Sequence, residues 1–191
     1  MTRRPPCARV AAAAAALAFG LAGCGSPPPK SAEPGPAQVR ADLRGSAPPL
    51  QGLHAQASQL LPGGRTALDA RLRALRGYPV VINKWAQWCP PCSAEFPILQ
   101  QVSVQFGRRV AFLGLDSNDY SGPAAAFLRR FPISYPSYVD PHGTLAASVG
   151  AGYGQPLTVF ITPTGQQVFV HAGAYADAAD LIHDIRFYVL R

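Results

Sequence analysis

Runs of apolar residues, each bounded by glycine, proline or polar residues, predict the strands of the fold. Runs of this length and content are typical of strands buried in a sheet. The predicted strands are Pro79–Trp85, Val110–Leu115, Pro136–Val139, Leu157–Ile161 and Gln167–His171. The last two strands are joined by Thr162-Pro163-Thr164-Gly165, a turn of hairpin type.

Apolar residues three or four positions apart predict helices between these strands. The first predicted helix follows a possible capping box, Thr66–Asp69, and ends at Gly77. The others run from Cys89 to Phe106, from Pro123 to Phe131, and through Leu181, Ile182, Ile185 and Tyr188. Strands that alternate with helices predict an α/β sheet covered on both faces.

The chain opens with the organisation of an export signal. Three arginines within the first nine residues precede an apolar stretch, Val10–Ala22. This stretch is shorter than the roughly 20 residues that a membrane-spanning helix needs. It ends in Leu21-Ala22-Gly23-Cys24, which resembles the lipobox of bacterial lipoproteins, where the cysteine is acylated. We predict a signal peptide over 1–23 and a lipid anchor on Cys24, at the extracytoplasmic face of the cell membrane. Ordinary signal cleavage is the alternative.

The composition changes between this leader and the patterned part of the chain. Residues 24–52 are rich in proline, glycine and serine and show no apolar periodicity. Such a segment predicts a tether with no core of its own, either a spacer above the membrane or a disordered tail. The predicted folded domain covers 53–191, which is long enough to bury a core.

The distribution of charge argues against a protein that binds nucleic acid. The formal net charge is +7, but three of the 17 basic residues lie in the leader. The remaining basic residues are scattered, and no run is longer than a pair. We therefore expect a mildly basic surface and no nucleic-acid partner.

Cys89 and Cys92 are the candidate reactive groups. They flank Pro90 and Pro91 where the strand 79–85 passes into a predicted helix. The thiolate is the attacking species in disulfide exchange, and a helix N-terminus lowers the pKa of a thiol. Prolines suit the first helical turn, where backbone N–H groups lack partners. Cys92, one turn later, is in position to attack a mixed disulfide formed by Cys89.

Other uses of the cysteine pair fit less well. A structural zinc site needs four ligands, but Cys7 and Cys24 lie in the leader region and the four histidines are dispersed. A covalent haem site needs histidine after the second cysteine, where this chain has Ser93. An inert disulfide stays open, although so short a loop contributes little entropy. We favour a redox pair, with no metal and no cofactor.

The segment around the cysteines resembles the active site of the thioredoxin superfamily, and specifically that of TlpA/ResA-like membrane-tethered thiol-disulfide oxidoreductases. Asn83–Cys92 (NKWAQWCPPC), followed by Glu95-Phe96-Pro97, carries the resemblance, which extends from about Leu53 to the C-terminus. It implies a thioredoxin-like α/β fold with a central mixed sheet and helices on both faces.

The resemblance also implies roles for neighbouring residues. Glu95 matches an acidic residue thought to help move protons, and Pro97 matches a proline that kinks the active-site helix. Gly154–Thr158 matches a loop whose cis proline lies against the cysteines, which here is Pro156. That arrangement leaves the Gln155 backbone free to pair with an extended substrate peptide. Trp88, Gln155 and Pro156 are therefore expected to line the substrate groove.

Two positions depart from thioredoxins proper. Asn83 stands where they have a buried aspartate, as it often does in the TlpA/ResA-like group, and Lys84 replaces an apolar or aromatic residue. We expect the Lys84 stem to pack and its ammonium to reach water at the edge of the sheet, with thiolate stabilisation as the alternative. Asp116 ends a strand, and a helix-capping role is expected for it.

The predicted protein is a disulfide reductase in which Cys89 attacks a disulfide of an exported protein and Cys92 resolves the mixed disulfide. The resemblance implies a client such as apocytochrome c, hence a place in cytochrome c biogenesis. It also implies electrons from a membrane reductase of the DsbD/CcdA kind. A disulfide-donating oxidase and a non-catalytic, peptide-binding lipoprotein are the alternatives.

Overall fold

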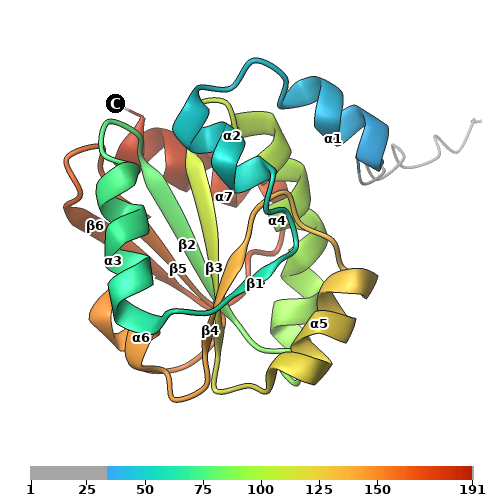
Figure 1. Ribbon diagram of the computed structural model, residues 1–191, viewed down its shortest axis with the longest axis vertical. Helices are drawn as coiled ribbons and strands as arrows, with labels where there is room; N and C mark the ends of the chain where they lie inside the picture. The colour runs from blue at the N-terminus through green and yellow to red at the C-terminus, as the bar shows by residue number, and fades with distance from the viewer. Residues whose placement is uncertain (1–33, 191) are drawn as a thin grey trace, which may run out of the picture. The chain divides into compact units, whose positions relative to one another are not determined.

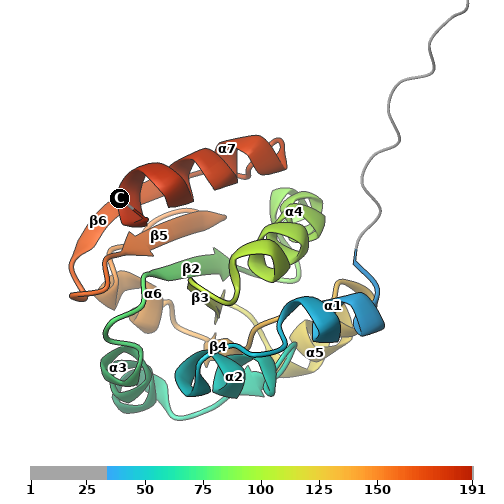
Figure 2. The ribbon, with the colours of Figure 1, turned by 90° about the horizontal axis from the view of Figure 1, so that it is seen from above.

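The computed structural model describes residues 34–190, which form a mixed sheet with helices on both faces (Figures 1 and 2). The strands are β1 (Leu60–Leu61), β2 (Val80–Trp85), β3 (Ala111–Ser117), β4 (Ser137–Asp140), β5 (Leu157–Ile161) and β6 (Gln167–Ala172). The helices are α1 (Pro36–Asp42), α2 (Pro48–His54), α3 (Gly64–Ala74), α4 (Pro90–Phe106), α5 (Ser121–Arg130), α6 (Thr144–Ser148) and α7 (Ala178–Asp184). A π-helical turn, η1 (Ile185–Val189), follows α7.

The strands lie in the order β1-β4-β3-β2-β5-β6. The first four in that order pair in parallel, whereas β5 runs antiparallel to β2 and to β6. Strand β2 is therefore central, with β3 on one side and β5 on the other. The carboxyl ends of β2, β3 and β4 and the start of β5 lie together at the same end of the sheet.

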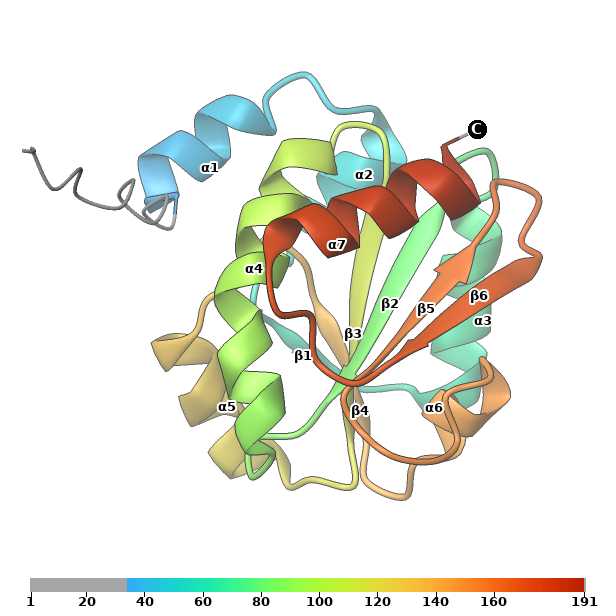
Figure 3. The same ribbon diagram turned by 180° about the vertical axis from the view of Figure 1, so that it is seen from behind.

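A hydrophobic core lies on each face of the sheet, and the two cores differ in composition. Helices α4, α5 and α7 cover one face of the sheet (Figure 3). They pack on an aromatic core, which includes Trp85, Phe96, Phe112, Phe127 and Phe160. Helices α2, α3 and α6 pack on a mostly aliphatic core, which includes Leu50, Leu68, Ile82, Leu113 and Leu115. Both faces of β2 are buried, which explains its nearly unbroken apolar run.

All five predicted strands are present, and each predicted end lies within two residues of the observed one. The predicted capping box is wrong, because Gly63, with φ of 108°, precedes α3 and no side chain caps it. The Asp69 carboxylate instead accepts a hydrogen bond from Arg65 Nε at 2.8 Å. The pattern also missed β1 and α6, which are too short to show a period.

Residues 36–54 differ from the expected tether. They form α1 and α2, and the expected start of the folded domain at residue 53 falls inside α2. The prolines responsible for the tether prediction start these helices, since Pro36 and Pro48 occupy first-turn positions that need no N–H donor. Leu50 and Leu53 of α2 are fully buried in the aliphatic core.

The predicted signal peptide, Cys24 and the tether up to residue 33 lie outside the described residues. None of the helices within residues 34–190 combines the length and hydropathy that crossing a bilayer requires.

Candidate active site

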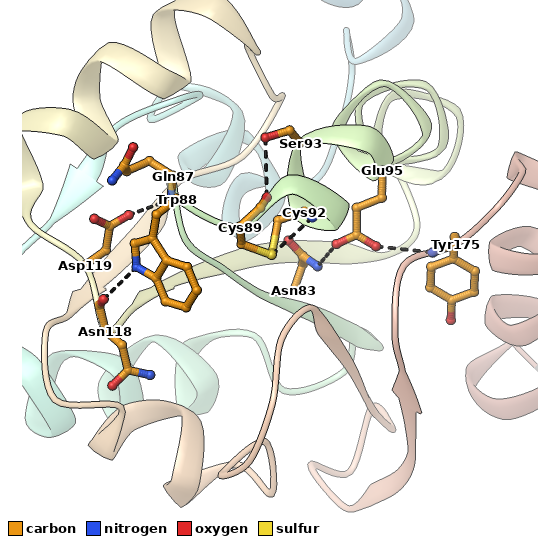
Figure 4. The surroundings of a disulfide bond; sticks show 10 residues. All are labelled: Asn83, Gln87, Trp88, Cys89, Cys92, Ser93, Glu95, Asn118, Asp119 and Tyr175. Atoms are coloured by element: carbon orange, nitrogen blue, oxygen red, sulfur yellow. Dashed lines mark hydrogen bonds between the residues drawn. A yellow bond between two sulfur atoms is a disulfide. The ribbon is translucent and has the colours of Figure 1, made fainter.

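The two cysteines lie where β2 hands over to α4, and they form a disulfide (Figure 4). Cys89 is the N-cap residue of α4, in an extended backbone conformation, and Cys92 lies in the first turn. Pro90 and Pro91 fill the first helical positions, as expected. Both cysteines are buried, with Cys89 slightly more accessible at 3% exposure against 0%.

The start of α4 directs a backbone donor at the first sulfur. The backbone N–H of Cys92 donates to Cys89 Sγ, with the two atoms 3.2 Å apart. In the reduced protein the same donor, together with the positive end of the helix dipole, stabilises a thiolate on Cys89. The local geometry therefore favours Cys89 over Cys92 as the attacking sulfur.

Trp88 stands at the surface beside this sulfur, and the residue is 54% exposed. Its ring is held in place, because Trp88 Nε1 donates to the Asn118 carbonyl at 2.9 Å. The neighbouring Gln87 N–H donates to the Asp119 carboxylate. A surface groove of about 600 Å³ runs from Trp88 and Pro90 to Phe127 and Arg130 of α5. The loop after β3 thus holds Gln87 and Trp88, the two residues that precede Cys89, in place.

Glu95 is fully buried on α4, one turn after Cys92. One carboxylate oxygen accepts from Asn83 Nδ2 at 2.8 Å, and the other accepts from the backbone N–H of Tyr175 at 3.3 Å (Figure 4). Burial raises the pKa of Glu95 from 4.5 to about 7, although both hydrogen bonds act in the opposite direction. Near neutral pH this carboxyl group can therefore take up or release a proton.

The Gln155–Pro156 peptide bond is cis, as the resemblance implied. Pro156 is buried and directly precedes β5, so it lies at the end of the sheet where β2 ends. The side-chain amide of Gln155 has no hydrogen-bond partner among the described residues. Tyr153, earlier in the same loop, is 97% exposed.

The expectation for Lys84 is wrong. Its ammonium does not reach water, since the residue is 1% exposed and lies in the central strand rather than at an edge. Lys84 Nζ donates to the carbonyl oxygens of Ala151 and Gly152, at 3.0 and 3.4 Å. Burial lowers the pKa of Lys84, and the negative charge of Asp140 acts against this shift.

The capping role expected for Asp116 is also wrong. Asp116 is fully buried at the end of β3, and neither carboxylate oxygen accepts a hydrogen bond from a described residue. Burial, followed by the nearby Asp119 and Asp140 carboxylates, raises the pKa of Asp116 to about 8. Asp140 is the residue that caps a helix, because its side chain accepts from the N–H groups of Leu145 and Ala146.

Sequence reasoning missed Tyr175, Asp119 and Asp140 around this site. Tyr175 acts through its backbone N–H, which every residue but proline carries, so the sequence holds no signal for it. Asp119 follows β3 and Asp140 is the last residue of β4, and polar residues at the carboxyl ends of parallel strands are a signal that could have found them.

Together these features define a thioredoxin-like protein, in which a mixed sheet carries a Cys-x-x-Cys pair at a helix N-terminus beside a cis proline. The chain belongs to the AhpC/TSA family, whose model matches residues 58–168. It is thereby confirmed as a member of the thioredoxin superfamily.

Similar proteins include the thiol:disulfide interchange protein DsbE of Escherichia coli (strain K12), 38% identical over 99 residues that cover 51% of each chain. A DsbE homolog of Paracoccus denitrificans is 34% identical over 114 residues, or 59% of this chain and 60% of the relative. A secreted Mycobacterium tuberculosis disulfide oxidoreductase of known structure has 28% identity and a TM-score of 0.53, covering 59% of this chain and 84% of its own. The match thus spans about half to three fifths of the curated relatives' length.

Proposed function

We propose that this protein is a thiol-disulfide oxidoreductase that acts outside the cytosol and reduces disulfides in exported proteins. The observation that carries the proposal is the Cys89–Cys92 pair at the N-terminus of α4, with a backbone N–H directed at Cys89 Sγ. The names of the relatives support the same chemistry.

In the first step, the Cys89 thiolate attacks one sulfur of the client disulfide, and the other client sulfur leaves as a thiolate. In the second step, Cys92 loses its proton and attacks Cys89 Sγ. This attack closes the Cys89–Cys92 disulfide and releases the second client thiol. Two electrons pass from the dithiol to the client in each cycle. Glu95 takes the Cys92 proton, a role that its pKa of about 7 and its place on the same helix support.

The substrate groove in this proposal is formed by Trp88, Gln155 and Pro156. The cis proline loop offers the Gln155 backbone to an extended client segment, which would add to the edge of the site as a strand. Apocytochrome c is the first client to test, and a membrane reductase of the DsbD/CcdA kind is the proposed electron donor. The lipid anchor on Cys24 would hold the domain at the extracytoplasmic face of the membrane.

Insulin reduction by dithiothreitol tests the chemistry. Cys89→Ser should reduce the catalysed rate to background, and Cys92→Ser should accumulate a mixed disulfide visible on a non-reducing gel. Ser93→Ala, which removes a hydroxyl one position along the same turn, is the matched control and should keep its activity. Full activity in Cys89→Ser would contradict the mechanism and leave a non-catalytic, peptide-binding role.

The reduction potential decides the direction of electron flow. A value of about −270 mV or lower is typical of reductants, whereas about −120 mV is typical of a disulfide donor. Equilibration of the Cys89–Cys92 pair with glutathione or dithiothreitol buffers, read by the fluorescence of the adjacent Trp88, gives the value. Mass spectrometry of the mature N-terminus tests the anchor separately, since an unmodified Cys24 would exclude it.

A further inference from the structure

Lys84 is a buried, charged residue of β2 that the redox mechanism does not use. Its neighbours across the sheet are Leu115 on β3 and Leu157 on β5, and around it lies the aliphatic core. Taking an ammonium out of water costs several kcal/mol, and a leucine would suit these surroundings better. A residue that breaks the local pattern in this way is expected to have a function.

The ammonium binds the segment that leads to the cis proline. Lys84 Nζ donates to the Ala151 and Gly152 carbonyls, five and four residues before Pro156. The Ala151 carbonyl lies in a buried contact, where its oxygen needs a donor because burial removes it from water, and the Gly152 carbonyl lies in a partly buried one. An ammonium has three N–H donors and can serve both carbonyls at once, which no apolar side chain can do.

Between Ala151, which is buried in the aliphatic core, and the buried Pro156, the segment has no regular structure to define its shape. Residues 150–156 form no helix or strand, and Gly150, Gly152 and Gly154 make the backbone unusually free. At one end, the Ala151 N–H donates to the Ala146 carbonyl at 2.8 Å, and at the other, Pro156 accepts from the Gly173 N–H at 3.1 Å. Between these points, Lys84 supplies the side-chain hydrogen bonds that hold the loop.

We propose that Lys84 is a positioning residue for the peptide site, whose buried ammonium holds the 151–156 loop in the shape that receives an extended client segment. The proposal rests on the proposed function and deepens it by naming what sets client affinity. Lys84 and Asn83 are consecutive in β2 and point to opposite faces, so the ammonium is directed away from Glu95 and the aromatic core. Its effect is therefore on binding of a peptide and not on the reactivity of the sulfurs.

Asp140 is the charged group that opposes the loss of the Lys84 charge. Its carboxylate accepts from Ser117 Oγ, Leu145 N and Ala146 N, so it is fixed at the start of α6. No ion pair between Lys84 and a carboxylate occurs among the described residues. The carbonyls of the loop are thus the direct partners of the ammonium, and Asp140 contributes only through its field.

The test compares a large and a small disulfide substrate, using the full-length chain. Lys84→Met keeps the length of the side chain but removes the charge and the donors. We expect the KM for a disulfide-linked peptide to rise about fivefold or more, with kcat changed less than about twofold, equivalent to a modest loss of binding free energy. The rate with 5,5′-dithiobis(2-nitrobenzoate), which needs no peptide groove, should be unchanged. Lys84→Arg should recover part of the peptide affinity.

Ser148→Ala is the matched control, because it removes a hydrogen bond to the Leu145 carbonyl in α6 without touching the loop carbonyls. Its KM should equal that of the wild type. Hydrogen exchange gives a second readout, in which Lys84→Met should speed exchange of the Ala151 and Gly173 amides, which donate to the Ala146 and Pro156 carbonyls, while the amides of β2 and β3 stay protected.

Three outcomes would overturn the proposal. They are an unchanged peptide KM in Lys84→Met, an equal loss with both substrates, and failure of every Lys84 variant to fold, which would leave only a structural role. A wild-type protein inactive on both substrates would instead contradict the proposed function itself.

Discussion

Near the end of β2, the consecutive side chains of Asn83 and Lys84 point to opposite faces of the sheet. The buried polar groups on the two faces have different partners. Asn83 faces α4 and donates to Glu95, whose pKa of about 7 lets it change charge near neutral pH. Lys84 faces α6 and donates to two backbone carbonyls, which cannot take its proton. In our proposal, one face therefore supplies the group that takes up the Cys92 proton, and the other holds the loop that receives the client.

The cores behind these groups differ in the same sense. On the aromatic face, Trp85 stacks on Phe127 with their ring centroids 5.1 Å apart, and Phe96 lies edge-on to both rings. These rings belong to the same core cluster as the two cysteines. The aliphatic face is closed in part by α2, from a stretch whose composition predicted a tether. The comparison indicates that α2 belongs to the stable part of the fold, whereas α1 buries none of its residues.

The largest expected effect concerns α2. Leu50→Ala should lower the free energy of unfolding by about 2–5 kcal/mol, because it leaves a cavity in the aliphatic core. Urea denaturation followed by circular dichroism measures the change. Val39→Ala, in α1 where no residue is buried, is the control and should cost less than about 1 kcal/mol. An equally small effect in both variants would mean that residues 36–54 only lie against the domain.

The second prediction uses the raised pKa of Glu95. Because this pKa is about 7 in the folded protein and 4.5 without burial, the neutral form is the one that folding favours. Its contribution to stability is full below about pH 4.5 and is lost as the pH rises through about 7. Glu95→Gln should remove up to about 3 kcal/mol of this decline between pH 4.5 and 8. Unfolding measured across that range gives the slope, and an unaltered slope would contradict the assignment.

The third prediction contrasts two buried aspartates on opposite faces. Asp116 lies four residues after Phe112 on β3 and therefore faces the same aromatic core. Its carboxylate oxygens accept no hydrogen bond there from a described residue, whereas both carboxylate oxygens of Asp140 do. At pH 8, Asp116→Asn should stabilise the protein by about 1–2 kcal/mol, since it removes a charge that burial disfavours. Asp140→Asn should destabilise it by about 1–3 kcal/mol. Thermal unfolding of both variants gives the sign of each change in stability. A change of the same sign in both would contradict the prediction that the two aspartates differ.

Most of the sheet and the place of the dithiol follow from local sequence. The runs that form β2, β3 and β5 are apolar on both faces, and Cys89 begins a helix because Pro90 and Pro91 fit its first turn. The partners of Lys84 and the burial of Asp116 could not be predicted in this way. They depend on which of two faces a residue meets and on segments 24 to 68 positions away. The tether was mispredicted because prolines both break helices and start them.

The smallest expected effect is the coupling between the two faces. Glu95 and Lys84 share no hydrogen-bond partner, and the backbone of β2 lies between them, so their effects on stability should add within about 0.5 kcal/mol. A double-mutant cycle with Glu95→Gln and Lys84→Met measures the coupling. The cycle of Asn83→Leu with Glu95→Gln is the positive control and should couple by about 1 kcal/mol or more, because Asn83 donates directly to Glu95. Equal coupling in both cycles would mean that the loop and the proton site respond to each other through the strand, and that one face cannot be changed without the other.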